Sequence, residues 1–317
     1  MIKILANDGV HPDGVALLEK AGYQVDLNKI PQDELMERLQ EYDVICIRSA
    51  TKVRKDLIDA CPNLKIIARG GVGIDNIDHE YARSVGRTVI NTPAASSQSV
   101  AELAFAHIFS LSRFVFDANR NMPTEGNTKF KVLKKSYSAG VQLRGKAIGI
   151  IGFGRIGIEV ARIALGLGMR VLAVDPYKES ETISLEIPNV ESPIAVKVNT
   201  VTMDEMLMNA DYITVHVPGG NMLGEVEMAK MKDGVRLINT SRGGVIDEDA
   251  LLAALESGKV AGAGLDVFVG EPTPRKELLE HSRISLTPHI GASTGQAQTN
   301  IGLELAEKII AYFEDDK

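Results

Sequence analysis

The sequence predicts an α/β protein with two doubly wound lobes, in each of which helices cover both faces of a parallel sheet. Three observations support this fold class. From the N-terminus, short β-rich runs alternate with helical stretches, which is the pattern that parallel sheets produce. The same alternation begins again near residue 146. The chain has 317 residues, which exceeds the usual size of one domain.

The predicted strands of both lobes are short runs, most of them rich in Val, Ile and Leu. In the first lobe they are residues 3–7, 23–28, 43–49, 64–71 and 87–92, with helical stretches at 13–22 and 32–42. In the second lobe they are residues 146–152, 170–175, 211–217, 235–241, 260–268 and 283–289. Apolar runs of this kind are typical of parallel strands that are buried on both faces.

The segment between the lobes predicts a crossing followed by a long apolar helix. Pro93 and the serines after it form the crossing, and Ser97 or Ser99 is the predicted N-cap of the helix. The final segment, 295–316, also has apolar residues at helical spacing and is expected to return to the first lobe. The predicted domains are 1–94 with 290–317, and 95–289. The cleft between them would be crossed twice, which suits closure around a substrate.

Composition excludes several classes of function. The net charge of −7 and the isoelectric point near 5.5 argue against a nucleic-acid or acidic-membrane binder, which needs a broad basic face. Cys46 and Cys61 lack the spacing of metal ligands, and we expect buried, reduced thiols and no metal site. The N-terminus reads as a strand rather than a signal peptide, and no run reaches membrane-spanning length. We therefore expect a soluble, cytoplasmic protein.

A glycine fingerprint ends the first run of the second lobe. Residues 147–157 read AIGIIGFGRIG, and the fingerprint lies where a strand should turn into a helix. Gly152 allows the tight turn, Gly154 lets the backbone approach a pyrophosphate, and Gly157 lets the helix pack closely on the strand. The start of that helix, beside Arg155, favours an anion. Ordinary Gly-rich turns also carry such glycines, but this context favours a Rossmann domain that binds a dinucleotide.

An acidic residue follows the next predicted strand and indicates which dinucleotide is bound. Asp175 comes 18 residues after Gly157 and is expected to bind the adenosine ribose hydroxyls. Its charge would repel a 2′-phosphate, which favours NAD over NADP. The nearby Lys178 argues in the other direction.

Three later predicted strands are followed by residues that can perform proton-coupled chemistry. These residues are Arg242, Glu271 and His289. Ligands bind beyond the carboxyl ends of the strands in open α/β sheets, so the three side chains can converge. His289 suits an acid or base, Glu271 suits its orienting partner, and Arg242 suits a substrate carboxylate. Taken singly, each could be an ordinary polar or solvated residue.

The first lobe offers two arginines at the ends of successive predicted strands. Arg48 and Arg69 should face the same crevice as the loop Gly70–Gly73, and two cations there suit a doubly anionic substrate. The loop can present successive N–H groups to a carboxylate. Four lysines at 129, 131, 134 and 135 could add to the anion site, although charge runs are usually solvated faces.

These motifs resemble those of the D-2-hydroxyacid dehydrogenase family, and the resemblance covers essentially the whole chain. The segments that carry it are RSATKV at 48–53, ARGGVGIDNID at 68–78, NTPAASSQSVAELA, GFGRIG, NTSRGGVIDEDAL at 239–251, GLDVFVGEP and PHIGAST. The resemblance implies an NAD-binding Rossmann domain and a flavodoxin-like substrate domain with a cleft between them. It assigns catalysis to Arg242, Glu271 and His289.

The resemblance also implies the cofactor contacts, with Asp266 near the nicotinamide carboxamide. The implied contacts are Gly152, Gly154, Arg155, Ile156, Gly157, Asp175, His216, Val217, Pro218, Thr240, Ser241, Asp266, Gly291 and Ala292. The segment 179–202 is longer than usual in the family, which suggests a larger surface excursion beyond Asp175. The loop after Pro218 is shorter than the common form.

Among family members, the phosphoglycerate dehydrogenases resemble this chain most, in a short form without a C-terminal regulatory domain. The substrate contacts then implied are Arg48, Arg69, Gly70, Gly71, Val72 and Lys135. Lys135 is included because many relatives place a tryptophan and a basic residue here, whereas this chain has no tryptophan.

The expected activity is oxidation of D-3-phosphoglycerate to 3-phosphohydroxypyruvate, the first step of serine biosynthesis. The alternative within the enzyme class is a glyoxylate or hydroxypyruvate reductase, or another D-2-hydroxyacid dehydrogenase. Such an enzyme would not need Arg48 and Arg69 together. A non-catalytic protein that senses NADH is a more distant alternative, because the family also contains corepressors. The helix after Ser97 and the segment through Tyr137 resemble the family's dimer-forming region, so we expect a homodimer.

Overall fold

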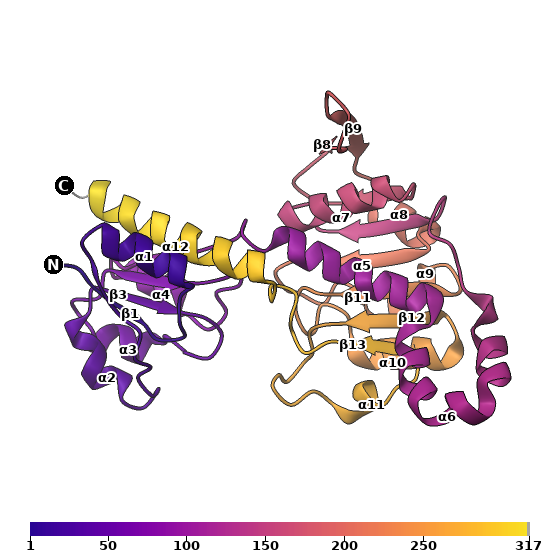
Figure 1. Ribbon diagram of the computed structural model, residues 1–317, viewed down its shortest axis with the longest axis horizontal. Coiled ribbons are helices and arrows are strands. Elements are labelled where there is room, and N and C mark those ends of the chain that lie inside the picture. Colours follow the sequence, from indigo (N-terminus) through magenta and orange to yellow (C-terminus); the bar gives the residue numbers. More distant parts are fainter. Residues whose placement is uncertain (316–317) are drawn as a thin grey trace. The chain divides into compact units, whose positions relative to one another are not determined.

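The computed structural model describes residues 1–315, which divide into two compact units (Figure 1). Unit 1 consists of residues 1–97 together with the segment from residue 292 onward, and unit 2 consists of residues 98–291. The domain limits expected from the sequence, after residues 94 and 289, lie three and two residues before these.

Unit 1 contains a parallel sheet of the order β2-β1-β3-β4-β5. The strands are β1 (Lys3–Ala6), β2 (Gln24–Asp26), β3 (Val44–Ile47), β4 (Ile66–Arg69) and β5 (Thr88–Asn91). This is the flavodoxin-like order, in which the first strand lies inside the sheet and the chain winds outward in both directions.

Both faces of the unit 1 sheet are covered, because alternate residues of each strand point to opposite sides. In β3, Val44 and Cys46 pack with α1 (Pro12–Lys20) and α12 (Gly295–Asp315), whereas Ile45 and Ile47 pack on the opposite face. The opposite face is covered by α2 (Leu35–Arg38), the short 3-10 turn Leu39–Glu41, α3 (Lys55–Ala60) and α4 (His79–Ser84). Helix α12 lies along α1 (Figure 1). The C-terminal helix is therefore part of the core of unit 1.

Unit 2 contains a second parallel sheet, of the order β13-β12-β11-β10-β6-β7. The strands are β6 (Ala147–Ile151), β7 (Arg170–Val174), β10 (Tyr212–Val215), β11 (Val235–Asn239), β12 (Val260–Leu265) and β13 (Ile284–Leu286). The chain moves from β6 to β7 on one side and later resumes at β10 on the other. Ligands bind at such a switch point, outside the carboxyl ends of the strands. The prediction of two doubly wound parallel sheets is confirmed.

Helices cover both faces of this sheet as well. On one face, α5 (Ser97–Arg113) and α7 (Arg155–Gly166) pack on Ile148 and Ile150. On the other face, α8 (Met203–Asn209), α9 (Glu225–Lys230) and α10 (Glu248–Ser257) pack on residues such as Ile213 and Leu237. The short helix α11 (Lys276–Leu279) precedes β13.

The segment after Asp175, expected only as a surface excursion, forms an antiparallel hairpin. Its strands are β8 (Ser180–Leu185) and β9 (Ile194–Asn199), paired from Ser180 with Asn199 to Leu185 with Ile194. Ile183 and Val198 are buried in the core that also holds α7. Thr200 then pairs in parallel with Ala173, so the segment leaving β9 continues the main sheet beyond β7.

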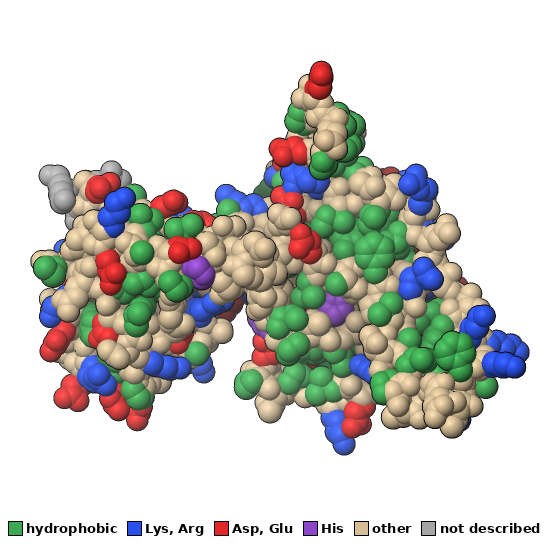
Figure 2. Space-filling model, viewed as in Figure 1, with side chains coloured by type: hydrophobic (Ala, Val, Ile, Leu, Met, Phe, Trp, Pro, Cys, Tyr) green, Lys and Arg blue, Asp and Glu red, His purple; other side chains and the backbone are tan. Residues whose placement is uncertain are grey.

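A long helix, α6 (Val115–Ser136), follows α5 and leads through the 3-10 turn Tyr137–Ala139 to β6. Hydrophobic side chains are exposed along α5 and α6, and Figure 2 shows them gathered over these helices. They are Phe109, Val115, Met122, Phe130 and Val132. Within residues 1–315, no single helix is long and apolar enough to cross a membrane; residues 97–113 and 115–139 meet that test only jointly, as a pair bent by 59°.

Candidate active site

The glycine fingerprint forms a cradle at the switch point of the unit 2 sheet. Gly152 follows β6 with a φ of +91°, and a Cβ there would come within 2.6 Å of the His216 carbonyl oxygen. A Cβ on Gly157 would overlap the carbonyl oxygen of Gly152. A Cβ on Gly154, in contrast, would meet no atom within 4 Å. The first and last glycines are therefore needed for packing, and the middle one borders open space.

The open space lies at the N-terminus of α7, where Gly154 is the N-cap. The N–H groups of the first helical turn, including those of Arg155 and Ile156, have no intrahelical acceptor. They carry the positive end of the helix dipole and suit the pyrophosphate of a dinucleotide. The residues present therefore fit the predicted cofactor.

Asp175 is held by two backbone donors at the end of β7. Its Oδ2 accepts a hydrogen bond from the N–H of Phe153 at 2.8 Å, and its Oδ1 accepts one from the N–H of Tyr177 at 2.9 Å. Lys178 forms an ion pair with Glu181 at 2.6 Å. Because Glu181 pairs with this lysine, Lys178 offers less attraction to a 2′-phosphate, and the charge of Asp175 favours NAD.

The neighbouring strands present buried polar atoms toward the same edge. His216 Nε2 bonds to Thr214 Oγ1 at 2.9 Å, and burial lowers the pKa of His216 to about 3, so the ring is neutral. Among the described residues, His216 Nδ1 and Thr240 Oγ1 are buried without a hydrogen-bond partner. Buried polar atoms are normally paired, so these two suit a ligand at this edge. Val217 and Pro218 follow His216, and Ser241 follows Thr240.

Arg242 lies in the loop after β11, and Asn239 organises this loop. The Nδ2 of Asn239 donates to the Arg242 carbonyl oxygen at 2.8 Å, and its Oδ1 accepts from the N–H and hydroxyl of Ser241 at 3.0 and 2.9 Å. The guanidinium of Arg242 donates to the Ser241 carbonyl oxygen at 2.7 Å. Asn239 was not among the residues singled out from the sequence, although it begins the NTSRGG motif.

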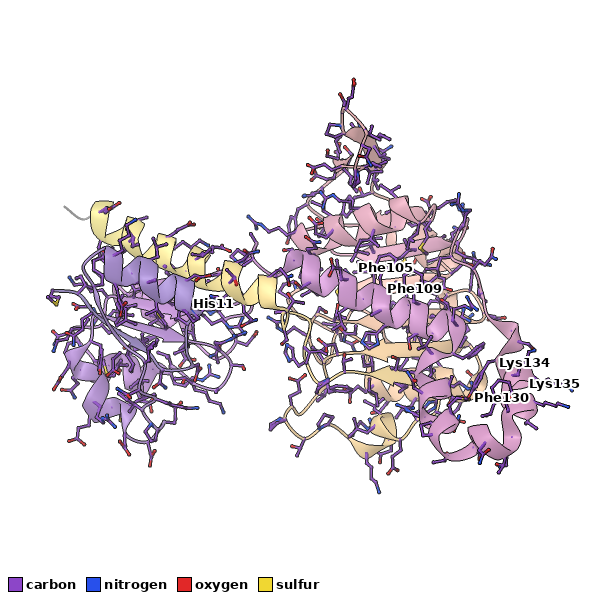
Figure 3. The ribbon with its side chains drawn as sticks, in the orientation of Figure 1. His11, Phe105, Phe109, Phe130, Lys134 and Lys135 are labelled. Atoms are coloured by element: carbon purple, nitrogen blue, oxygen red, sulfur yellow. The ribbon has the colours of Figure 1, made fainter. Side chains whose placement is uncertain are left out.

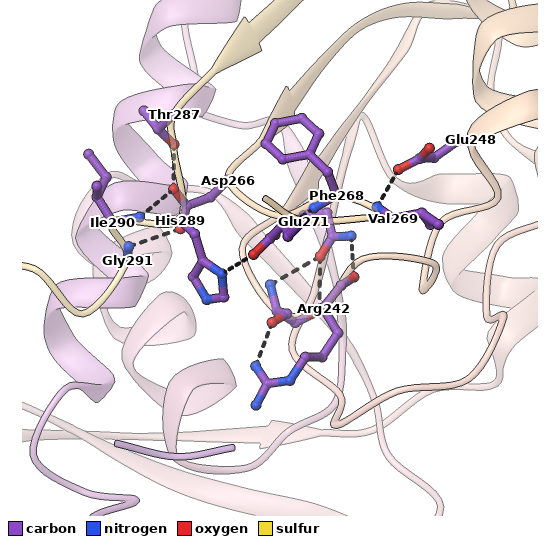
Figure 4. Close-up of polar contacts among 12 residues, drawn as sticks. Arg242, Glu248, Asp266, Phe268, Val269, Glu271, Thr287, His289, Ile290 and Gly291 are labelled. Carbon is purple, nitrogen blue, oxygen red and sulfur yellow. Dashed lines mark hydrogen bonds and ion pairs between the residues drawn. The ribbon is translucent and has the colours of Figure 1, made fainter. Parts of the chain in front are cut away.

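Glu271 and His289 form a hydrogen-bonded pair (Figure 4). Glu271 Oε2 lies 2.7 Å from His289 Nδ1, and Glu271 Oε1 accepts from the Phe268 N–H at 2.9 Å. The glutamate is thus anchored to the backbone after β12 while it orients the imidazole. The side chain of His289 is 50% exposed, and its Nε2 is directed away from Glu271. This geometry suits a histidine that exchanges a proton with a bound molecule.

Asp266 anchors the loop that carries His289. Its Oδ1 accepts from Thr287 Oγ1 at 2.6 Å and from the Ile290 N–H at 2.8 Å, and its Oδ2 accepts from the Gly291 N–H at 2.9 Å. Its carbonyl oxygen accepts from the His289 N–H at 2.8 Å. Burial raises the pKa of Asp266, while these hydrogen bonds oppose the change. The sequence indicated a cofactor contact for Asp266 but not this anchoring role.

In unit 1, the two predicted arginines lie at the carboxyl ends of adjacent strands. Arg69 is the last residue of β4 and pairs in register with Ile47, which Arg48 follows. Arg48 donates a hydrogen bond from Nη1 to Gln298 Oε1. A Cβ on Gly71 would overlap Nη1 of Arg69, so the Arg69 guanidinium lies over the start of the Gly70–Gly73 loop.

The first two N–H groups of that loop are already used, contrary to the expectation that they would bind a carboxylate. Gly70 donates to the Ile47 carbonyl oxygen at 2.9 Å, and Gly71 donates to Thr92 Oγ1 at 2.8 Å. These bonds close the loop against neighbouring strands. The prediction for Gly70 and Gly71 as N–H donors to substrate is corrected accordingly, and Val72 is the first expected donor.

Comparison with known proteins identifies the family. The family model for the NAD-binding domain of D-isomer specific 2-hydroxyacid dehydrogenases matches residues 105–291. The chain belongs to this family. Unit 2 is accordingly its NAD-binding domain, and the protein is an NAD-dependent D-2-hydroxyacid dehydrogenase.

Similar proteins include enzymes with different substrates. A hydroxypyruvate reductase of Thermotoga maritima is 43% identical to the dehydrogenase over 97% of each chain. A D-3-phosphoglycerate dehydrogenase of Bacillus subtilis is 39% identical over 98% of this chain and 57% of its own length. The dehydrogenase thus spans about half the length of the curated phosphoglycerate dehydrogenases that it matches.

Solved structures agree with this assignment. A glyoxylate reductase from Paecilomyes thermophila superposes with a TM-score of 0.82 at 28% identity and covers 100% of this chain and 96% of its own. The NAD+-bound 3-phosphoglycerate dehydrogenase of Entamoeba histolytica gives a TM-score of 0.76 at 26% identity, with coverage of 100% and 96%.

Two further predicted contacts are Ala292 and Lys135. Ala292 belongs to unit 1, where its carbonyl oxygen accepts from Gln298 Nε2 at 2.7 Å. Lys135 is exposed on α6 and points away from unit 2, as does Lys134 (Figure 3). The end of α6 leads to the amino end of β6, whereas Arg242, Glu271 and His289 follow carboxyl ends of strands. The substrate contact expected for Lys135 stays a prediction.

Tyr177 was missed by the sequence reasoning, although it lies two residues after Asp175. Its side chain is 93% exposed, which is unusual for an aromatic ring in this protein. An exposed ring beside Asp175, the predicted ribose contact, is suited to stacking on a planar base.

Proposed function

We propose that the dehydrogenase oxidises D-3-phosphoglycerate to 3-phosphohydroxypyruvate with NAD. The observation that carries this proposal is the pair of arginines at adjacent strand ends, Arg48 and Arg69. A substrate with one carboxylate and no second anion needs one arginine, and Arg242 can supply it. Two further guanidinium groups at one sheet edge match a phosphoryl group.

The chemistry requires removal of a hydride and a proton from the substrate carbinol. A bound NAD would supply the acceptor for the hydride that leaves C2. His289 accepts the hydroxyl proton at Nε2, and Glu271 holds the ring through Nδ1 and stabilises the charged imidazole that results. Arg242 binds the carboxylate and polarises the C2 oxygen as it gains carbonyl character.

Unit 1 recognises the remainder of the substrate in this proposal. Arg48 and Arg69 bind the phosphoryl oxygens, and the N–H groups from Val72 onward bind the carboxylate. Gln298 keeps the Arg48 guanidinium in place, while Asn91 steadies the loop by donating to the Val72 carbonyl oxygen at 2.6 Å. Preorganised donors of this kind lower the entropic cost of binding.

Hydroxypyruvate reduction is the second candidate, and one observation favours it. The Thermotoga reductase is similar over 97% of both chains, whereas the phosphoglycerate dehydrogenases are matched over about half their length. A reductase of this kind would use the same unit 2 residues, with His289 donating the proton.

Steady-state kinetics with matched substrates distinguish the two candidates. The pairs are D-3-phosphoglycerate against D-glycerate, and 3-phosphohydroxypyruvate against hydroxypyruvate. We expect a kcat/KM at least about tenfold higher for the phosphorylated member of each pair. We expect Arg48→Gln and Arg69→Gln to remove this preference, while Arg38→Gln, a control on the exposed face of α2, retains it. A preference for the unphosphorylated members would establish the reductase instead.

We infer further that two copies of the chain associate through α5 and α6, whose exposed apolar residues Phe109, Phe130 and Val132 would be covered. Lys135 could then serve the site of the other copy. Light scattering should give the mass of a dimer, and the double variant Phe130→Asp, Val132→Asp should give the mass of a monomer. A monomeric wild-type protein would contradict the proposal.

Participation in serine biosynthesis and a cytoplasmic location remain predictions that accompany this function.

A further inference from the structure

A buried histidine on α5 is connected to the site by a chain of hydrogen bonds. His107 is 2% exposed, and its Nε2 lies 3.0 Å from Thr287 Oγ1. Thr287 Oγ1 in turn lies 2.6 Å from Asp266 Oδ1. The other ring nitrogen of His107, Nδ1, lies 2.9 Å from Ser285 Oγ.

The directions of these bonds follow from the chemistry of the groups. Burial lowers the pKa of His107 to about 4, so the ring is neutral and carries one N–H. Thr287 has one hydroxyl proton, which goes to the carboxylate of Asp266, because the carboxylate can only accept. His107 must then donate from Nε2 to Thr287, and Nδ1 accepts from the Ser285 hydroxyl. One tautomer satisfies every group in the chain.

The chain ends on the carboxylate that shapes the His289 loop. Asp266 accepts from Ile290 and Gly291, the two residues after His289, and from Thr287, two residues before it. His289 itself has a φ of +53°, a left-handed conformation that is uncommon for a non-glycine residue. Such a backbone persists only where the surroundings hold it in place. The bonds to Asp266 on both sides of His289 supply that constraint.

His107 is also fitted closely against β12. A Cβ on Gly264 would come within 2.5 Å of His107 Cβ, so the glycine allows the ring to approach the strand ends. A leucine or methionine would fill the same volume with apolar atoms but would leave Thr287 and Ser285 without their partner. The presence of an imidazole in this place therefore calls for a polar role.

We propose that His107 is a positioning residue of the dehydrogenase. Through Thr287 it fixes the orientation of the Asp266 carboxylate, and Asp266 fixes the loop that presents the His289 imidazole to the substrate and the Gly291 backbone to the cofactor. The inference rests on the proposed role of His289 as the proton acceptor, and it holds for whichever 2-hydroxy acid the enzyme oxidises.

Four variants separate positioning from packing. His107→Phe retains the ring volume and removes both hydrogen bonds. His107→Gln keeps an N–H donor near the place of Nε2. Thr287→Val breaks the chain beyond His107, and Ser285→Ala, the matched control, removes the bond that does not lead to Asp266. The melting temperature of each variant is measured first, and kinetics are recorded well below it.

The measurements are kcat, the KM for the 2-hydroxy acid that the wild-type enzyme oxidises best, and the dissociation constant for NADH from its fluorescence. We expect His107→Phe and Thr287→Val to lower kcat about tenfold or more, because a displacement of a catalytic group by 1 Å can cost about a hundredfold. KM should change little. His107→Gln should recover much of kcat, and Ser285→Ala should stay within about threefold of wild type. The double variant His107→Phe, Thr287→Val should lose no more than either single one, since both break one chain.

A wild-type kcat retained in His107→Phe would overturn the inference, as would an equal loss in Ser285→Ala. A higher KM or a weaker NADH affinity, with kcat unchanged, would also overturn it. If the wild-type protein oxidised no 2-hydroxy acid at all, the proposed function would fail instead, so the two failures are distinguishable.

Discussion

At the scale of single residues, the pairing of His289 with Glu271 assigns different tasks to the two ring nitrogens. Glu271 holds Nδ1, and Nε2 is the nitrogen that we propose for the substrate. We expect His289→Asn to lower kcat by about 10²- to 10⁴-fold, the usual contribution of a general base. Since asparagine removes no cofactor contact, NADH affinity should be unchanged by fluorescence titration. A variant that kept its turnover would require a different proton acceptor.

The carboxylate of Asp175 leads to a prediction about cofactor choice. Asp175→Ala should raise the KM for NAD about tenfold. It should also reduce the preference for NAD over NADP, because the charge that opposes a 2′-phosphate is removed. Adding Glu181→Gln should improve NADP use further, since it releases Lys178 from its ion pair. The ratio of kcat/KM for the two cofactors measures both effects. An unaltered ratio in the double variant would rule out this account of discrimination.

The positions of candidate residues that follow a strand end were predictable from the sequence. Arg242, Glu271 and His289 each follow a predicted strand, and the structure brings Glu271 and His289 into contact. Roles that depend on distant backbone groups were not predictable. Asp266 anchors N–H groups 24 and 25 residues further along, and the Gly71 N–H is taken by Thr92, 21 residues away. No local pattern encodes such partners.

At the scale of secondary structure elements, the β8–β9 hairpin is the clearest addition to the expected fold. It is secured by Ile183 and Val198, which are buried with α7, and Arg162 of that helix donates to the Ser184 carbonyl oxygen at 3.0 Å. The hairpin is hard to predict from sequence because most of β9 is exposed, so its strand lacks a continuous apolar face. Every buried parallel strand, in contrast, was indicated by its apolar run.

A pair of substitutions tests whether the hairpin is part of the fold. Ile183→Ala should lower the free energy of unfolding by about 2–4 kcal/mol, as expected for truncation of a fully buried isoleucine. Val190→Ala, at the exposed end of the hairpin, should change it by less than about 0.5 kcal/mol. Urea unfolding at neutral pH measures both. Equal effects of the two substitutions would mean that the hairpin is not packed on α7.

At the scale of the whole molecule, buried neutral histidines make stability depend on pH. The pKa of His107 is lowered to about 4 and that of His216 to about 3, whereas both titrate near 6.5 in the unfolded chain. Below pH 6.5 the unfolded state therefore binds protons that the folded state does not. The stability due to this difference is complete above pH 6.5 and is lost as the pH falls toward 4.

We expect His107 alone to contribute a slope of up to about 1.4 kcal/mol per pH unit in that window. Urea unfolding at pH 7.5, 6 and 5 should show a shallower decline for His107→Gln than for the wild-type protein, whatever its stability at pH 7.5. Parallel declines would show that His107 accepts a proton in the folded state.

Helix α12 affects the order in which the two units fold during synthesis. It covers one face of the unit 1 sheet with Leu305, Ile309 and Phe313, yet it begins at residue 295, whereas the last strand of that sheet ends at residue 91. Domains usually fold during synthesis in the order in which they emerge. Unit 2 is continuous in sequence and can fold first. At that stage unit 1 still lacks α12, so Ile4, Val44 and Ile66 remain uncovered. We expect nascent chains that are stalled with residues 292–317 still inside the ribosome tunnel to resist protease within 98–291 and to be cleaved within 1–97. Residues 1–97 would then be the part of the chain that a chaperone must protect longest.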